Sequence, residues 1–234
     1  MSSAPCLPRP SPTTTGRVIL LHGIWALPVM MDGMARALRD QGYATLNPLY
    51  RSRAHAIDRI VDGLHPRFER FAREADGPVH FVTHSMGSLV LRAYFARHRP
   101  SWLGRAVMLA PPNDGSAWVD LIRGLRLSGL VLGPSADLLA PRRTPAMRAA
   151  LGEIDFPLGV IAGTRPMMAF ASDPIFREPN DGKVAVRATH VGGQADHITV
   201  PASHVWISRH RETIRQTIAF LADGRFAAHP PAMN

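Results

Sequence analysis

The amino-acid sequence predicts an α/β fold, with a mostly parallel sheet that carries helices on both faces. Short apolar runs alternate along the chain with longer segments whose apolar residues recur at helical spacing. Strands that alternate with helices form parallel sheets, because each helix returns the chain to the same edge of the sheet. At 234 residues the chain is long enough for one such domain with a substantial core and too short for a second large domain.

The predicted strands are short and apolar. The first is the run Val18–Leu21, and runs without polar alternation are typical of strands that are buried on both faces. The expected strands lie near residues 18–21, 43–47, 79–83, 105–110, 158–162 and 197–200.

The predicted helices lie near residues 29–40, 55–74, 87–98 and 209–222. The second has an apolar stripe that indicates a core-facing surface and not a cofactor site, formed by Ile57, Ile60, Val61, Leu64, Phe68 and Phe71. Pro66 is expected to kink or interrupt this helix. The last helix has a similar stripe, formed by Ile214, Ile218 and Leu221.

The stretch VHFVTHSMG at residues 79–87 indicates a serine on a tight turn between a strand and a helix. Such a turn exposes the hydroxyl of Ser85 and leaves the backbone N–H of Met86 free to bind an oxyanion. Gly87 is expected where the new helix passes close to neighbouring backbone. Thr83 replaces the first glycine of the usual G-x-S-x-G pattern, so a surface serine in an ordinary loop remains the alternative.

A second motif follows the first predicted strand, the sequence His22-Gly23-Ile24-Trp25. The N–H of Ile24 is expected to be the second oxyanion donor, and Gly23 to let the backbone approach the reacting carbonyl. His22 is expected to orient or pack and not to carry protons. Where the catalytic serine lies on a turn between a strand and a helix, the acid and then the base follow that serine in the sequence, whereas His22 precedes it. Trp25 is expected either to wall a substrate pocket or to pack.

With both motifs, the chain resembles the α/β-hydrolase superfamily, and most closely its small bacterial lipases and esterases. The resemblance runs from about residue 17 to residue 226, with a cap at about 115–155. It is carried, in the expected order, by VILLHGIW at 18–25, FVTHSMGSLVLR at 81–92, MLAPPNDGS at 108–116, EPNDGKVAV at 178–186 and PASHVW at 201–206.

The order Ser…Asp…His in this fold identifies Asp181 as the acid and His204 as the base. Asp181 lies in a turn-rich loop after the fifth predicted strand, and His204 directly follows the sixth. His204 would accept the proton of Ser85, and Asp181 would hold its tautomer. Other candidates are less favoured. They are Asp173 and Asp196 for the acid, and His190, His197 and His210 for the base. Asp114 is expected to be structural.

The residues of the cap would determine which substrates bind. Trp118, Leu121, Ile122 and Leu125 share one helical face, which suits either a mobile apolar lid or an ordinary packing helix. The pocket residues expected are Trp25, Trp118, Leu121 and Met167; Met167 would line the pocket with Met168 and Phe170, or fill the core.

Composition limits the binding partners and cofactors that are expected. The net charge of +9 comes almost wholly from arginines spread over the chain, which disfavours nucleic-acid binding but is compatible with weak attraction to anionic lipid surfaces. The single cysteine, Cys6, excludes an internal disulfide. No metal-ligand spacing or phosphate-binding glycine loop stands out, so no metal and no cofactor is expected.

Residues 1–16 are expected to form a disordered leader without a signal peptide, and residues 227–234 a frayed tail. A cytoplasmic location is the expectation.

These features together predict a hydrolase that cleaves carboxylic esters by way of an acyl-enzyme. A thioesterase, an amidase or an acyltransferase on the same residues stays open, as does a non-catalytic binding module.

Overall fold

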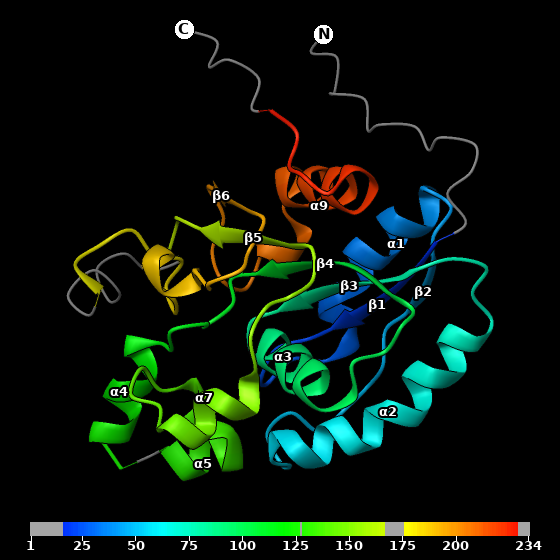
Figure 1. Ribbon diagram of the computed structural model, residues 1–234. Helices are drawn as coiled ribbons and strands as arrows, with labels where there is room; N and C mark the ends of the chain where they lie inside the picture. Colours follow the sequence, from blue (N-terminus) through cyan, green and yellow to red (C-terminus); the bar gives the residue numbers. More distant parts are fainter. Residues whose placement is uncertain (1–15, 127, 167–175, 229–234) are drawn as a thin grey trace, which may run out of the picture.

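In the computed structural model, six strands form one sheet in the order β2-β1-β3-β4-β5-β6, and every pairing is parallel (Figure 1). The structure describes residues 16–126, 128–166 and 176–228. The bounds of the strands are β1 (Arg17–Leu21), β2 (Ala44–Leu46), β3 (Val79–His84), β4 (Leu103–Leu109), β5 (Leu158–Gly163) and β6 (Asp196–Val200). The predicted fold class is confirmed, and the strands begin and end within two residues of the predicted positions.

Four long helices cover the sheet, two on each face (Figure 1). They are α1 (Asp32–Asp40), α2 (Ile57–Arg73), α3 (Met86–His98) and α9 (Arg211–Asp223). Alternate residues of β1 divide between the two layers: Val18 and Leu20 pack in the cluster with α1 and α9, and Ile19 and Leu21 in the cluster with α2 and α3. This division follows from the period of two in a strand and explains why the strand sequences are apolar throughout.

Helix α2 continues through Pro66, so the interruption expected at that residue does not occur. Pro66 is exposed, and the carbonyl that loses its N–H partner there can be hydrated. The opposite face of the helix is buried as predicted, with Leu64 and Phe68 in the core.

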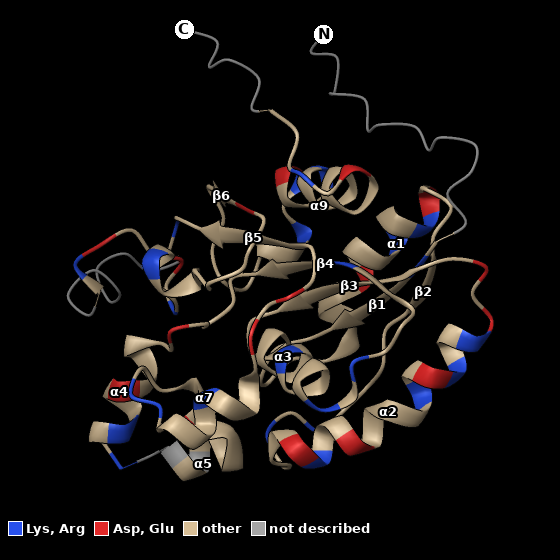
Figure 2. Cartoon of the chain, viewed as in Figure 1, with Lys and Arg blue, Asp and Glu red and all other residues tan. Residues whose placement is uncertain are grey.

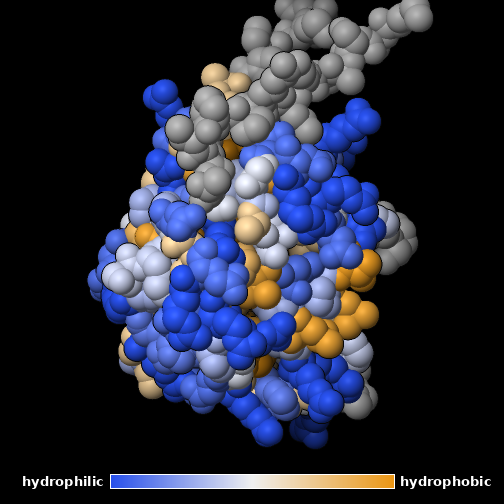
Figure 3. Space-filling view, turned by 90° about the vertical axis from the view of Figure 1, so that its right-hand side faces the viewer, coloured by the Kyte–Doolittle hydropathy of each residue, from blue (hydrophilic) through white to orange (hydrophobic). Residues whose placement is uncertain are grey.

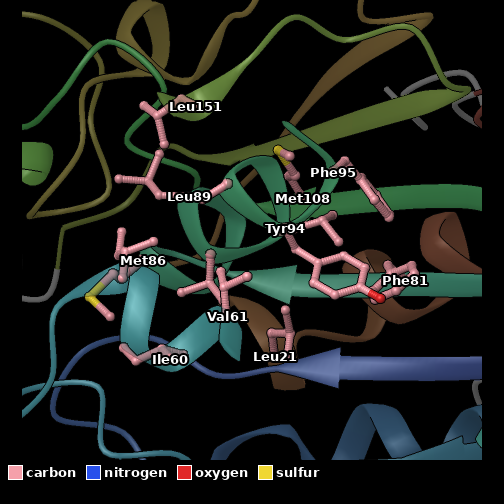
Figure 4. Packing of buried hydrophobic residues seen from close by; sticks show 14 of the residues in the cluster. Leu21, Ile60, Val61, Phe81, Met86, Leu89, Tyr94, Phe95, Met108 and Leu151 are labelled. Carbon is pink, nitrogen blue, oxygen red and sulfur yellow. The ribbon is translucent and has the colours of Figure 1, made fainter. Parts of the chain in front are cut away.

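The core beneath β3 and α3 is closely packed. Figure 4 shows Leu21, Val61, Phe81 and Tyr94 pointing toward one another between the sheet and the two helices. Phe68 makes edge contacts with Phe81 and Tyr94 at ring-centroid distances of 5.7 and 5.0 Å. This packing holds the junction of β3 and α3 in place.

Short helices fill the connection between β4 and β5, in the interval that the sequence assigns to the cap. They are α4 (Ala117–Gly124), α5 (Ser128–Leu132), η2 (Gly133–Ser135), α6 (Ala136–Leu139) and α7 (Pro145–Leu151). Figure 1 shows that they lie together at one end of the molecule, beyond α3. The expected leader and tail fall almost entirely outside the described residues.

Charged residues are distributed over the whole fold. Figure 2 shows arginines and acidic residues interspersed on α2 and scattered over the other elements. The face in Figure 3 is mostly hydrophilic, with apolar residues gathered in one area to the right of the centre and a few others scattered over the view. No helix among the described residues has the length and apolar character needed to cross a membrane.

Candidate active site

Ser85 sits on a strained turn between the last residue of β3 and the first of α3. Its backbone angles are φ 53° and ψ −124°, a region that residues other than glycine rarely adopt. Gly87 is required here by close approach, because a Cβ atom would lie 2.6 Å from the carbonyl oxygen of Leu21 and 2.7 Å from that of His22. The turn therefore depends on tight backbone packing between α3 and the end of β1.

Thr83, in the position usually taken by glycine, is fully buried. Its Oγ1 lies 2.8 Å from the hydroxyl oxygen of Ser88, which is also buried. The two hydroxyls satisfy each other, so the threonine is accommodated without an unpaired polar group.

Ser85, His204 and Asp181 form a continuous hydrogen-bonded chain. The Nε2 atom of His204 lies 2.9 Å from the Oγ of Ser85, and the Nδ1 of His204 lies 2.7 Å from the Oδ2 of Asp181. All three residues are buried. Because a carboxylate only accepts, the proton between His204 and Asp181 belongs to Nδ1, which leaves Nε2 free to accept the proton of Ser85.

The carboxylate of Asp181 is fully engaged. Its other oxygen, Oδ1, accepts hydrogen bonds from the backbone N–H groups of Lys183 at 2.9 Å and Val184 at 2.8 Å. The backbone N–H of His204 also donates to the carbonyl oxygen of Asp181 at 2.9 Å. These contacts fix the two loops that follow β5 and β6 to each other.

The competing histidines and acids lie elsewhere. The Nε2 of His197 contacts the hydroxyl of Thr189 at 2.8 Å, and its ring stacks on His190 at 3.7 Å. Asp196 accepts from the backbone N–H of Phe226 at 3.0 Å. Asp114 is exposed on the connection after β4, and His210 lies at the N-terminus of α9. Asp173 lies outside the described residues.

The expected oxyanion donors flank the serine. The N–H groups of Ile24 and Met86 have no hydrogen-bond partner within the part of the chain that the structure describes. Ile24 lines the pocket beside Ser85, and Met86 directly follows the serine with its side chain in the core (Figure 4). A Cβ atom on Gly23 would lie 3.0 Å from the Cβ of Ser85, so the glycine permits this close approach.

His22 occupies a packing position. It is fully buried and stacks on Tyr50 at 4.0 Å, and its Nδ1–H donates to the carbonyl oxygen of Gly23 at 2.9 Å. The hydroxyl of Tyr50 donates to the carbonyl of His22. Burial lowers the pKa of His22, which keeps the ring neutral.

His84 is a site residue that the sequence reasoning missed. It is buried next to Ser85, and its Nε2–H donates to the backbone carbonyl of His204 at 2.9 Å. Burial, reinforced by His204, lowers the pKa of His84 well below its usual value, so the ring stays neutral. His84 thus ties the end of β3 to the loop that holds the imidazole of His204. Its place inside the serine motif was the only signal in the sequence.

A pocket of about 280 Å³ opens over Ser85 and His204. Trp25 and Trp118 line this pocket, and the indole N–H of Trp25 donates to the carbonyl of Val131 in α5. Leu121 does not: it is 47% exposed on α4 and lies outside the lining. Met167, with Met168 and Phe170, lies outside the described residues.

The face shared by Trp118, Leu121, Ile122 and Leu125 is only partly covered. Leu121 and Leu125 are exposed, whereas Ile122 is buried. Helical spacing alone could not distinguish these two environments. Among the described residues, no group of three or more His, Cys, Asp or Glu side chains could hold a metal ion.

Neither a scan against models of protein families nor a search of curated proteins finds a match. Solved structures do match. A lipase from Bacillus licheniformis in its mature form superposes with a TM-score of 0.72 at 16% identity, covering 95% of this chain and 96% of the lipase. The chain covers 54% of the propeptide form of that lipase.

Two further neighbours are a metagenomic carboxyl esterase and a type II thioesterase from the borrelidin biosynthetic cluster. The esterase gives a TM-score of 0.65 at 18% identity, over 88% of this chain and 69% of its own. The thioesterase gives 0.53 at 18% identity, over 92% and 94%. At these identities the likeness establishes the fold, and the chain has the α/β-hydrolase fold that its sequence motifs predict.

Proposed function

We propose that the protein hydrolyses carboxylic esters, with Ser85 as nucleophile, His204 as general base and acid, and Asp181 as the group that orients and stabilises the imidazole. One observation carries the proposal: the chain of contacts from Ser85 Oγ through His204 to Asp181, at 2.9 and 2.7 Å, at the base of a largely apolar pocket. Separations of this length are those required for proton transfer between a nucleophile and its base.

The first half of the reaction forms an acyl-enzyme. Ser85 Oγ attacks the ester carbonyl while its proton passes to Nε2 of His204. The N–H groups of Ile24 and Met86 stabilise the oxyanion of the tetrahedral intermediate. His204 then donates the proton to the leaving alcohol oxygen, and the C–O bond breaks.

The second half returns the enzyme to its starting state. His204 takes a proton from water, the resulting hydroxide attacks the acyl carbon, and the carboxylic acid leaves as the proton returns to Ser85 Oγ. Asp181 remains a carboxylate throughout and stabilises the imidazolium that forms in each half.

The substitution Ser85→Ala tests the proposal. It is expected to abolish hydrolysis of a chromogenic short-chain ester and covalent labelling by a fluorophosphonate, because both reactions need the hydroxyl as nucleophile. Ser101→Ala makes the same chemical change at an exposed position before β4 and should leave both reactions intact. Labelling or turnover that persists in Ser85→Ala would refute the assignment.

The same chemistry would also cleave thioesters, and a structural neighbour is a thioesterase. A panel of matched acyl esters, acyl thioesters and acyl amides, with alcohols added as competing acceptors, separates hydrolysis of oxygen esters from the related activities. The proposal predicts that oxygen esters give the highest kcat/KM and that the free acid is the main product. Contact with anionic lipid surfaces remains a prediction from the net charge.

A further inference from the structure

Lys183 lines the pocket together with Ser85 and His204. It is the only lysine in the chain, since the other basic residues that carry the net charge of +9 are arginines. It also lies two residues after Asp181, on the loop that positions the carboxylate. A sequence that otherwise uses arginine for its positively charged side chains therefore places its one lysine in the wall of the candidate active site.

The surroundings of this ammonium are apolar. Its Nζ lies over the ring of Trp118, 5.2 Å from the centroid, within the range of a cation–π contact. Most of the other residues of the pocket wall are hydrophobic, among them Val119, Leu132 and Leu139. Burial lowers the pKa of Lys183, while the charge of Asp181 acts in the opposite direction.

Within the described ranges, no carboxylate lies within ion-pair distance of Lys183. Asp181, the nearest acid in sequence, is occupied by His204 and by two backbone N–H groups. A partly buried cation that makes no ion pair with any described residue is unfavourable, and an anion that enters the pocket would stabilise it.

We propose that Lys183 binds an anionic group of the substrate, so that the site prefers esters bearing a carboxylate or phosphate-like group near the scissile carbonyl. This inference rests on the proposed function, since it names the class of ester that the same site accepts. The apolar wall would hold the carbon chain, and the ammonium would select the charge at its end.

A second role for Lys183 would be purely electrostatic, through the nearby Asp181 and His204. Such an effect would change turnover of charged and neutral esters equally and would shift the pH profile of both. A binding role changes the ratio of kcat/KM for anionic esters to kcat/KM for neutral esters. The experiment therefore measures this anionic-to-neutral ratio.

The test uses matched chromogenic substrates. Mono-para-nitrophenyl esters of succinate, glutarate and adipate carry a free carboxylate, and their methyl-capped diesters have the same chain without the charge. The para-nitrophenyl ester of phosphonopropionate supplies the phosphate-like arm. For the wild type, kcat/KM for the best anionic ester should exceed that of its capped partner at least about tenfold, equivalent to about 1.4 kcal/mol.

Substitution then assigns this preference to one side chain. Lys183→Met should bring the anionic-to-neutral ratio close to one, and Lys183→Arg should retain most of it. Arg70→Met removes the same charge from an exposed position on α2 and should leave the ratio unchanged. Added salt should weaken the preference of the wild type. An unaltered ratio in Lys183→Met, or a wild type that lacks the preference, would overturn the inference while ester hydrolysis stands.

A binding readout keeps the inference separate from the proposed function. In Ser85→Ala, the single lysine can be acetylated with acetic anhydride and quantified by mass spectrometry, with the N-terminal amine as internal reference. Glutarate or phosphonopropionate should protect Lys183 several-fold, and dimethyl glutarate should not. Equal protection by the charged and neutral compounds, or no protection by either, would refute anion binding at Lys183 even if every ester proved inert.

Discussion

Replacing Asp181 with asparagine should abolish the proposed ester hydrolysis although the two side chains have nearly the same shape. The reason lies in the contacts of Oδ1, which accepts from the backbone N–H groups of Lys183 and Val184 at 2.9 and 2.8 Å. In Asp181→Asn the amide oxygen must take this position, because an NH₂ group there would face two donors. The NH₂ group then points at Nδ1 of His204.

The size of the effect follows from the cost of reversing the amide. Reversal would leave two buried N–H groups without an acceptor, at about 1–3 kcal/mol each, or about 2–6 kcal/mol in total. The asparagine therefore donates to Nδ1, and the proton of the imidazole moves to Nε2, where it blocks transfer from Ser85. A penalty of that size lowers kcat by about 30-fold to 10⁴-fold, and losses near 10⁴ are known for this change in serine proteases.

Two measurements check this prediction. Steady-state kinetics on a short-chain chromogenic ester should give a kcat for Asp181→Asn no higher than that for Asp181→Ala, which removes the carboxylate without imposing a tautomer. Long-range proton–nitrogen NMR at neutral pH, with His204 assigned by comparison with His204→Gln, should show the proton on Nε2 in the asparagine variant. Activity within tenfold of wild type, or a proton that stays on Nδ1, would contradict the reasoning.

Two further predictions concern buried histidines. His84→Leu removes the donor to the His204 carbonyl and should lower kcat about tenfold with little change in KM. His84→Gln keeps a side-chain N–H and should retain most of the wild-type kcat. Equal losses of kcat in the two variants, measured by steady-state kinetics, would argue against a positioning role. Burial, helped by the charge of Arg105, lowers the pKa of His80 from 6.5 to about 4. The unfolded chain therefore binds the proton more readily, and the free energy of unfolding should fall as pH drops from 6.5 to 4, by at most about 3 kcal/mol. His80→Asn, whose oxygen can still accept from the N–H of Arg105, should reduce this fall in urea titrations, and an unchanged pH dependence would refute it.

Much of the fold could be predicted because its signals are local. Each buried strand is a short apolar run, and the faces of α2 and α9 follow from helical spacing. Of the kink or interruption expected at Pro66, the interruption was wrong for a related reason: a local rule for proline takes no account of the solvent that can satisfy the freed carbonyl.

Candidate site residues were located by topology. In a parallel sheet the loops after successive strands meet at one edge, so Asp181 after β5 and His204 after β6 were expected near Ser85 after β3. Contacts between distant segments left no such signal. The bond from His84 to the His204 carbonyl joins two segments 120 residues apart, and the contact of Lys183 with Trp118 depends on how α4 packs beside the loop after β5.

The serine motif itself combines two kinds of constraint. At Gly87 a Cβ atom would lie 2.6 and 2.7 Å from two carbonyl oxygens, and neither oxygen belongs to a flexible side chain that could move aside. At Thr83 the constraint is packing, which a side chain can meet if its polar atom finds a partner, as the Thr83 hydroxyl does at 2.8 Å from Ser88. Ser88 is the third residue of α3 and directly follows Gly87, so the compensating group lies beside the motif and not within it. A departure at the first position of G-x-S-x-G is therefore weaker evidence against such a turn than a departure at the last.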